Sequence, residues 1–104
     1  MTLRLRNLPL GDRYRRAAMH YRRGMYSLAR QELESVLDSA SELASEEEAE
    51  IRWQLANCCA ALGQSDEADR IVDAATELEG LSETTLSRLE AVRGFSALSR
   101  GDYA

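Results

Sequence analysis

Apolar residues recur at intervals of three and four along most of the chain, which is the spacing of one face of an α-helix. No segment alternates apolar and polar residues over a useful length, so no β-strand is predicted. The pattern predicts an extended arm over residues 1–10, ended by Pro9, and a single helical domain over residues 11–104. The expected fold class is all-α, with helices over residues 12–23, 26–42, 46–62, 65–79 and 83–100.

Three glycines, Gly24, Gly63 and Gly101, each follow a predicted helix and precede the start of another. They are 39 and 38 residues apart. Glycine adopts the left-handed conformation that ends a helix, so the spacing predicts a repeated helix hairpin. Serine side chains are expected to cap the helices that follow: Ser45, in a capping box with Glu48, Ser65 and Ser82.

The residues around these glycines also repeat. A small residue lies seven positions before each glycine (Ala17, Ala56 and Gly94), an alanine lies five after (Ala29 and Ala68), and a large apolar residue lies nine after (Leu33 and Val72). On these residues the chain resembles the tetratricopeptide repeat family over roughly residues 12–104. The middle repeat fits best, and the period of 38–39 exceeds the family's usual length of about 34 residues. The resemblance implies an α-solenoid of about two and a half antiparallel hairpins.

The resemblance further implies that the first helix of each hairpin lines a concave groove. The groove residues would be Gly11, Tyr14, Ala18, Tyr21 and Arg22, then Glu50, Trp53, Asn57, Ala60 and Ala61, then Arg88, Ala91, Phe95, Leu98 and Ser99. Four of the six aromatic residues fall in this set, which favours binding of an apolar helix or extended peptide. Two alternatives stay open: the rings pack together as core, or the leucines of the arm fold back and plug the groove.

Charge is divided unevenly along the chain, whose formal net charge is −5. Residues 1–30 hold eight arginines and one acid, whereas the remainder holds five arginines and 17 acids. The predicted basic patch consists of Arg13, Arg15, Arg16, Arg22 and Arg23. It is either a solvated helix face or a docking surface for acidic protein, including the acidic end of another copy in a homo-oligomer. Nucleic acid is not expected, because the excess of acids elsewhere repels phosphate.

No apolar run approaches the roughly 18 residues of a membrane helix, so membrane insertion is not expected.

Cys58 and Cys59 are adjacent in the sequence, and a disulfide between neighbouring helical residues has poor geometry. The two cysteines also lack the spacing of a metal-binding or redox pair. They are interpreted as small buried residues of a protein in the reducing cytoplasm.

Little in the sequence indicates catalysis. His20 is the only histidine, and no serine, cysteine or acid stands at an obvious partner spacing. Acids at residues 46–48 and 50 are better explained by a helix N-terminus, which favours negative charge, than by a cation site. No phosphate loop or metal-ligand cluster occurs, so we expect no enzyme, cofactor or metal.

The expected function is therefore non-catalytic protein binding, as an adaptor or chaperone that holds an apolar or amphipathic helix of a partner. In size, helix count and cytoplasmic character the chain is similar to the small tetratricopeptide-like chaperones of bacterial type III secretion systems. The alternative is a scaffold segment of a larger assembly, or part of a longer repeat array, that self-associates.

Overall fold

The computed structural model describes residues 9–39 and 42–100, and all regular structure among them is helical. The elements are α1 (Pro9–Arg22), α2 (Tyr26–Ser39), α3 (Ser45–Ala61), α4 (Ser65–Thr76) and α5 (Glu83–Arg100). The all-α prediction is confirmed for this part of the chain. Residues 1–8 of the predicted arm and Gly101, the third repeat glycine, lie outside the described residues.

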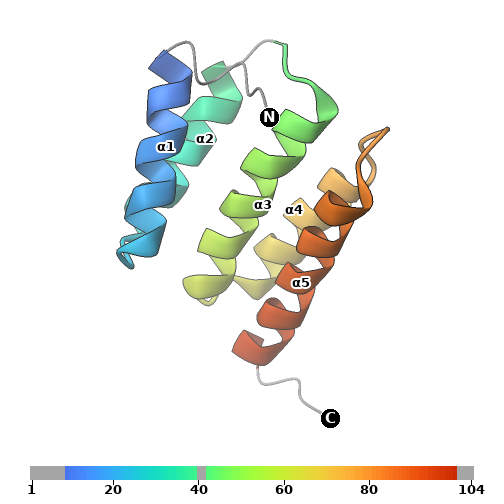
Figure 1. Cartoon of the computed structure of the whole chain (residues 1–104). Helices are drawn as coiled ribbons and strands as arrows, with labels where there is room; N and C mark the ends of the chain where they lie inside the picture. Colours follow the sequence, from blue (N-terminus) through green and yellow to red (C-terminus); the bar gives the residue numbers. More distant parts are fainter. Residues whose placement is uncertain (1–8, 40–41, 101–104) are drawn as a thin grey trace.

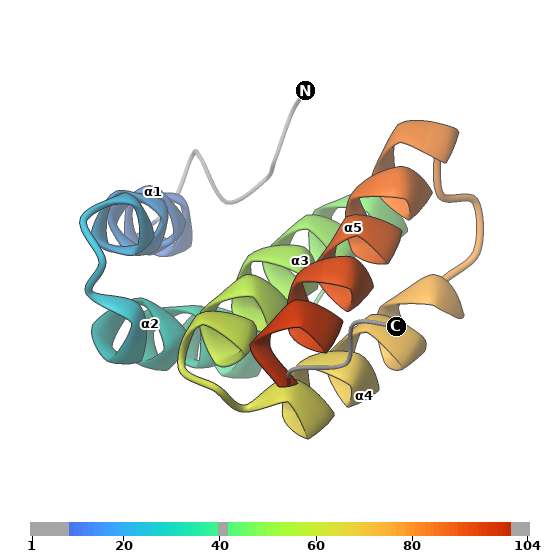
Figure 2. The same ribbon diagram turned by 90° about the horizontal axis from the view of Figure 1, so that it is seen from below.

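The helices form two layers. Seen along the helices, α1, α3 and α5 lie on one side, and α2 and α4 on the other (Figure 2). The helix α3 packs against α2, α4 and α5 and touches α1 over a small area, which makes it the centre of the core. The helices α1 and α5 lie at opposite ends of the arrangement (Figure 1).

The two hairpin turns share one backbone conformation. Gly24 and Gly63 both have a φ of 80°, in the left-handed region that glycine adopts without strain. In each turn the residue after the glycine donates its amide to a carbonyl five residues earlier: Met25 to His20 at 2.9 Å, and Gln64 to Cys59 at 2.8 Å. This is the Schellman pattern, formed twice at a separation of 39 residues.

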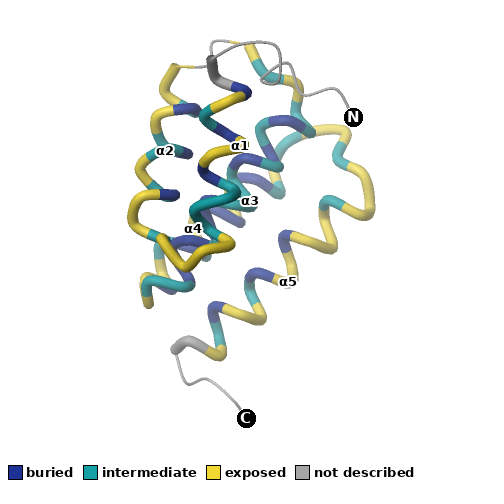
Figure 3. The backbone as a smooth tube through the Cα atoms, turned by 60° about the vertical axis from the view of Figure 1, so that its left-hand side comes forward, coloured by how far each residue is buried: buried dark blue, intermediate teal, exposed yellow. Residues whose placement is uncertain are grey.

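Equivalent positions of the two hairpins also fill the core. Four pairs, each 39 residues apart, are at most 1% exposed: Ala17 and Ala56, Ala29 and Ala68, Leu33 and Val72, and Val36 and Ala75. The small residues allow the two helices of a hairpin to approach closely, while the larger ones fill the space toward the next helix. Gly94 on α5 corresponds to Ala17 and Ala56 but is exposed, because no described helix covers that side of α5 (Figure 3).

The starts of the helices differ in part from the predictions. The helix α1 begins at Pro9, so the arm ends earlier than residue 10. Proline suits the first helical position, where its fixed φ is helical and its missing amide hydrogen has no partner to lose. At α3 the capping interaction lies one residue earlier than predicted, because Glu47 Oε1, and not Glu48, accepts the amide of Ala44 at 2.9 Å.

Two serines expected to act as caps have different roles. Ser82 caps α5 as predicted, with its Oγ accepting the Thr85 amide at 3.2 Å. Ser65 is the first residue of α4 and not its cap. Its hydroxyl donates to the Ser96 carbonyl, and the Ser96 hydroxyl donates to the Ser65 carbonyl, both at 3.2 Å. This buried reciprocal pair fixes the start of α4 against α5.

Candidate functional site

The predicted groove residues lie on the layer formed by α1, α3 and α5, which we call the aromatic face. Tyr14 of α1 is only 8% exposed, and its hydroxyl donates to Glu50 Oε2 of α3 at 2.6 Å. Burial, followed by this hydrogen bond, raises the pKa of Tyr14, so the phenol remains a neutral donor. Tyr14 is therefore core and holds α1 to α3 from beneath the face, instead of being open to a partner.

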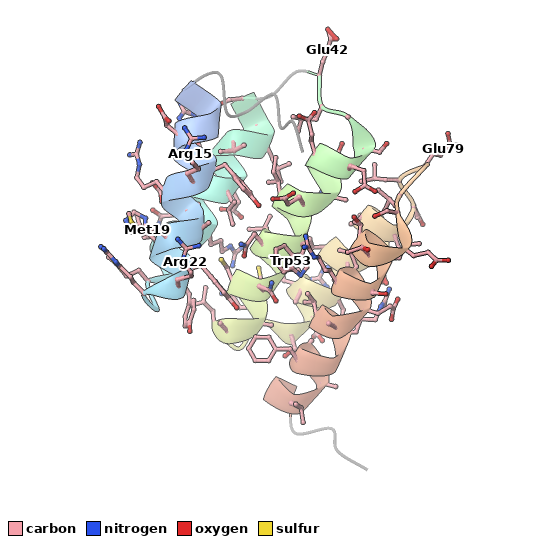
Figure 4. The ribbon with its side chains drawn as sticks, viewed as in Figure 1. Arg15, Met19, Arg22, Glu42, Trp53 and Glu79 are labelled. Carbon is pink, nitrogen blue, oxygen red and sulfur yellow. The ribbon has the colours of Figure 1, made fainter. Side chains whose placement is uncertain are left out.

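Trp53 is the central aromatic residue of this face. It is half-buried and packs against the core. The guanidinium carbon of Arg88, on α5, lies 5.2 Å from the centre of the indole ring, which is a cation–π distance. Figure 4 shows Trp53 between α3 and α5. Trp53 was interpreted from the sequence either as a groove residue or as a core residue, and it has features of both. It packs partly against the core, and an exposed arginine side chain lies over its ring.

Two large apolar side chains of α5 are accessible to a partner. Phe95 is 38% exposed and Leu98 is 60% exposed, the highest value among the large hydrophobic residues described. Ala91, one turn before Phe95, is exposed as well. An apolar helix surface of this kind gains free energy when a second apolar surface removes it from water.

The other predicted residues are divided between support and surface. Tyr21 is half-buried, and its ring centre lies 5.4 Å from that of Tyr26. Ala18 and Asn57 are half-buried, whereas Arg22 is exposed. The three helices thus bring the predicted residues onto one layer, but with very different accessibility.

Two surface hollows of the described residues lie away from the aromatic face. One, of about 470 Å³, is found at the start of α4 and is lined by Arg30, Gly63, Gln64, Ser65, Asp66, Glu67 and Arg70. The other, of about 280 Å³, lies between α1 and α2 and is lined by Arg13, Arg16, Leu28, Gln31, Glu32 and Ser35. The second hollow could not be predicted from the sequence, because its apolar residue, Leu28, is not one of the repeat positions and belongs to no motif.

The arginines of the predicted basic patch have different partners. Arg15 pairs with Asp12, Arg16 Nε lies 3.7 Å from Glu32 Oε2, and Arg13 donates to the hydroxyls of Ser35 (3.1 Å) and Ser39 (3.3 Å). Arg22 and Arg23 are exposed and form no ion pair within the described part of the chain. In Figure 4, Arg15 and Arg22 extend from α1 away from the other helices. The patch is thus a partly neutralised basic surface at one end of the molecule.

His20 has an acidic partner that the sequence did not indicate. Its Nδ1 lies 2.7 Å from Glu32 Oε1 on the neighbouring helix, and both side chains are largely buried. His20 and Glu32 are 12 residues apart and meet only because α1 packs against α2, so their sequence spacing does not predict the contact. His20 therefore joins the two helices of the first hairpin.

The acids at the start of α3 have separate protein partners. Glu46 accepts hydrogen bonds from the Thr85 hydroxyl at 2.6 Å and the Ser82 amide at 2.5 Å, and these bonds lower its pKa. Glu48 pairs with Arg52 at 2.8 Å, and Glu47 and Glu50 have the partners described above. Among the described residues no group of His, Cys, Asp and Glu could hold a metal ion.

Cys58 and Cys59 are free thiols that are fully buried on α3. Desolvation raises the pKa of both, and that of Cys58 to about 12. Because a thiolate is the reactive form, these side chains act as small core residues.

The raised pKa of Cys58 predicts a loss of stability in alkali. The folded state holds this proton more tightly than the unfolded chain, whose thiol has a pKa of about 8.5. The stabilisation is complete below that value and declines as the pH rises toward the folded value of about 12. Urea unfolding between about pH 7.5 and pH 9, below the tyrosine range, should show a falling free energy of unfolding. The slope should be smaller in Cys58→Ala, and an equal slope in both proteins would contradict the assignment.

No helix within the described residues is long and apolar enough to span a bilayer. Comparison of the chain with family models, with curated proteins and with solved structures finds no match.

Proposed function

We propose that this chain is a non-catalytic, cytoplasmic protein-binding module that holds an apolar or amphipathic helix of a partner protein on the aromatic face. The observation that carries the proposal is the pair of accessible side chains Phe95 and Leu98, which follow Arg88 of the Trp53–Arg88 stack along α5 at helical spacing. Large aromatic and arginine side chains are the usual anchors of protein interfaces. The partner would act as a client of an adaptor or a chaperone.

The repeated geometry supports an assignment to tetratricopeptide-like repeats. Two hairpins with the same glycine turn and the same four buried pairs are the units from which such arrays are built. An array of this kind presents its first helices side by side, as α1, α3 and α5 are here (Figure 2). The resemblance concerns architecture, and the binding role follows from the accessible side chains.

The polar groups of the face would orient the partner. Glu50 is held by the Tyr14 hydroxyl, and Arg88 lies over Trp53, so both charges have defined positions before binding. Groups that are already ordered lose little conformational entropy when a partner arrives. We infer an apolar contact along Phe95 and Leu98, with Glu50 and Arg88 bonding polar groups of the partner at its edge.

A library of amphipathic helical peptides of about 20 residues, displayed on phage, tests this function. A selected peptide should bind Phe95→Ala and Leu98→Ala at least about tenfold more weakly than the parent. Met25→Ala and Leu28→Ala are matched controls, because these side chains are also large, apolar and exposed but lie at the first hairpin. The proposal fails if no peptide binds, or if the control variants lose as much affinity.

A second candidate function is a segment that stacks within a larger assembly. It is favoured by Gly94, which is exposed at the position where Ala17 and Ala56 are covered by the next helix. A helix from another molecule could cover this side of α5 in the same way.

A further inference from the structure

One side of α5 carries an acidic and apolar stripe. Glu83, Leu86 and Glu90 are three and four residues apart and so share one face of the helix. All three are exposed, and Leu86 is 37% exposed although it is a large hydrophobic residue. Glu90 Oε2 lies 3.4 Å from Nε of Arg93, but Arg93 also pairs with Asp73 of α4, so this side of α5 keeps a net negative charge. The buried residues of α5, Leu89 and Val92, point to the core on a different face. We call these three exposed residues the α5 stripe.

A complementary surface lies at the other end of the molecule. The hollow of about 280 Å³ between α1 and α2, here called the α1–α2 hollow, contains Leu28, which is 37% exposed. Arg13 at this hollow bonds only to serine hydroxyls, so its charge is not compensated by a described carboxylate. Glu32, the one acid of the lining, is already engaged by Arg16 and His20. The hollow therefore combines an apolar contact with net positive charge.

The two surfaces cannot meet within one molecule. They belong to α1–α2 and α5, at opposite ends of the arrangement (Figure 1). The molecule measures 44 × 30 × 20 Å, and even the smallest extent exceeds the Debye length of about 10 Å at 0.1 M salt. The local charge of each end, and not the net charge of −5, thus decides which surfaces attract each other.

We propose that the α5 stripe of one molecule docks in the α1–α2 hollow of a second copy. Leu86 contacts Leu28, and Glu90 lies beside Arg13 of the neighbouring copy. The two surfaces differ, so the contact is head-to-tail and leads to open chains or closed rings. It does not use Trp53 or Phe95 and is independent of the proposed binding of a partner helix.

Sedimentation velocity of the chain of 104 residues tests the proposal. The parent should self-associate at about 50 mM NaCl and dissociate at about 500 mM, because salt screens the pairing of the two ends. A parent that stays monomeric at about 50 mM NaCl and high micromolar concentration overturns the proposal. So does an association that is equally strong at both salt concentrations.

Charge reversal distinguishes this contact from other modes of association. Arg13→Glu and Glu90→Arg should each weaken self-association by about tenfold or more. An equimolar mixture of the two variants should restore it, because the reversed hollow of one then pairs with the reversed stripe of the other. A contact that does not pair residue 13 of one copy with residue 90 of another would show no such restoration, and failure of the mixture to associate overturns the proposal.

Two controls and one apolar variant complete the experiment. Glu42→Arg and Arg70→Glu alter the net charge by the same amounts at exposed positions outside both surfaces and should associate like the parent. Figure 4 shows Glu42 on the segment that leads into α3, with its side chain pointing away from the helices. Leu86→Ala should also weaken association, while circular dichroism shows that the variant keeps the helical content of the parent and unfolds cooperatively. Normal association of Leu86→Ala and Glu90→Arg would exclude the α5 stripe.

Discussion

Leu33→Ala is expected to lower the free energy of unfolding by about 2–5 kcal/mol. Leu33 is 1% exposed in α2 and is one of the largest fully buried side chains. Its removal takes away apolar burial and leaves a cavity that the surrounding helices fill only in part. Val72, its equivalent in the second hairpin, is buried as well, so both hairpins depend on a large apolar residue at this position.

Leu28→Ala provides the matched control for this prediction. It makes the same chemical change in the same helix, at a side chain that is 37% exposed, and should cost about 1 kcal/mol or less. Urea unfolding should show a lower midpoint for Leu33→Ala with an unchanged slope. Equal costs at the two positions would mean that the assignment of the core face of α2 is wrong.

The sequence was sufficient to predict the helices and their repeat because both depend on local signals. Gly24 and Gly63 end helices through their own backbone preference, and the 39-residue spacing of buried pairs follows from apolar periodicity. The ends of helices were predicted less well. Pro9 fits either the end of an arm or the first turn of a helix, and Ser65 fits either a cap or a buried hydrogen-bonding residue. For Ser65, only the packing of α4 on α5 shows that the side chain is a buried hydrogen-bonding residue.

The candidate site shows the same division. Spacing was sufficient to predict that Tyr14, Trp53 and Phe95 lie on α1, α3 and α5, which are side by side, but it did not predict which of these rings are accessible. The burial of Tyr14 against Glu50 could not be predicted, because the two residues are 36 positions apart and meet only through the contact of α1 with α3. The position of Arg88 over Trp53 likewise depends on how α5 packs on α3.

Trp53→Ala is expected to affect binding more than folding. The side chain is half-buried, so its loss should cost about 2 kcal/mol of stability or less, below the 3–5 kcal/mol or so of a fully buried large aromatic residue. The affinity for a selected helical peptide should fall by at least about 2 kcal/mol, as for an interface anchor. Thermal unfolding and peptide titration of the same preparations give the two values.

Fluorescence of this single tryptophan shows whether the ring is accessible in the free protein. Acrylamide should quench it moderately in the parent and more strongly in Arg88→Ala, because the guanidinium over the ring is then gone. Addition of the selected peptide should protect the ring and shift its emission to the blue. Removal of residues 1–8 tests the remaining alternative, in which the predicted arm covers the groove. If the arm covers Trp53, acrylamide quenching should be stronger in the shortened chain than in the parent. If quenching is weak in the parent, in Arg88→Ala and in the shortened chain alike, Trp53 is a core residue and the aromatic face does not bind a partner through it.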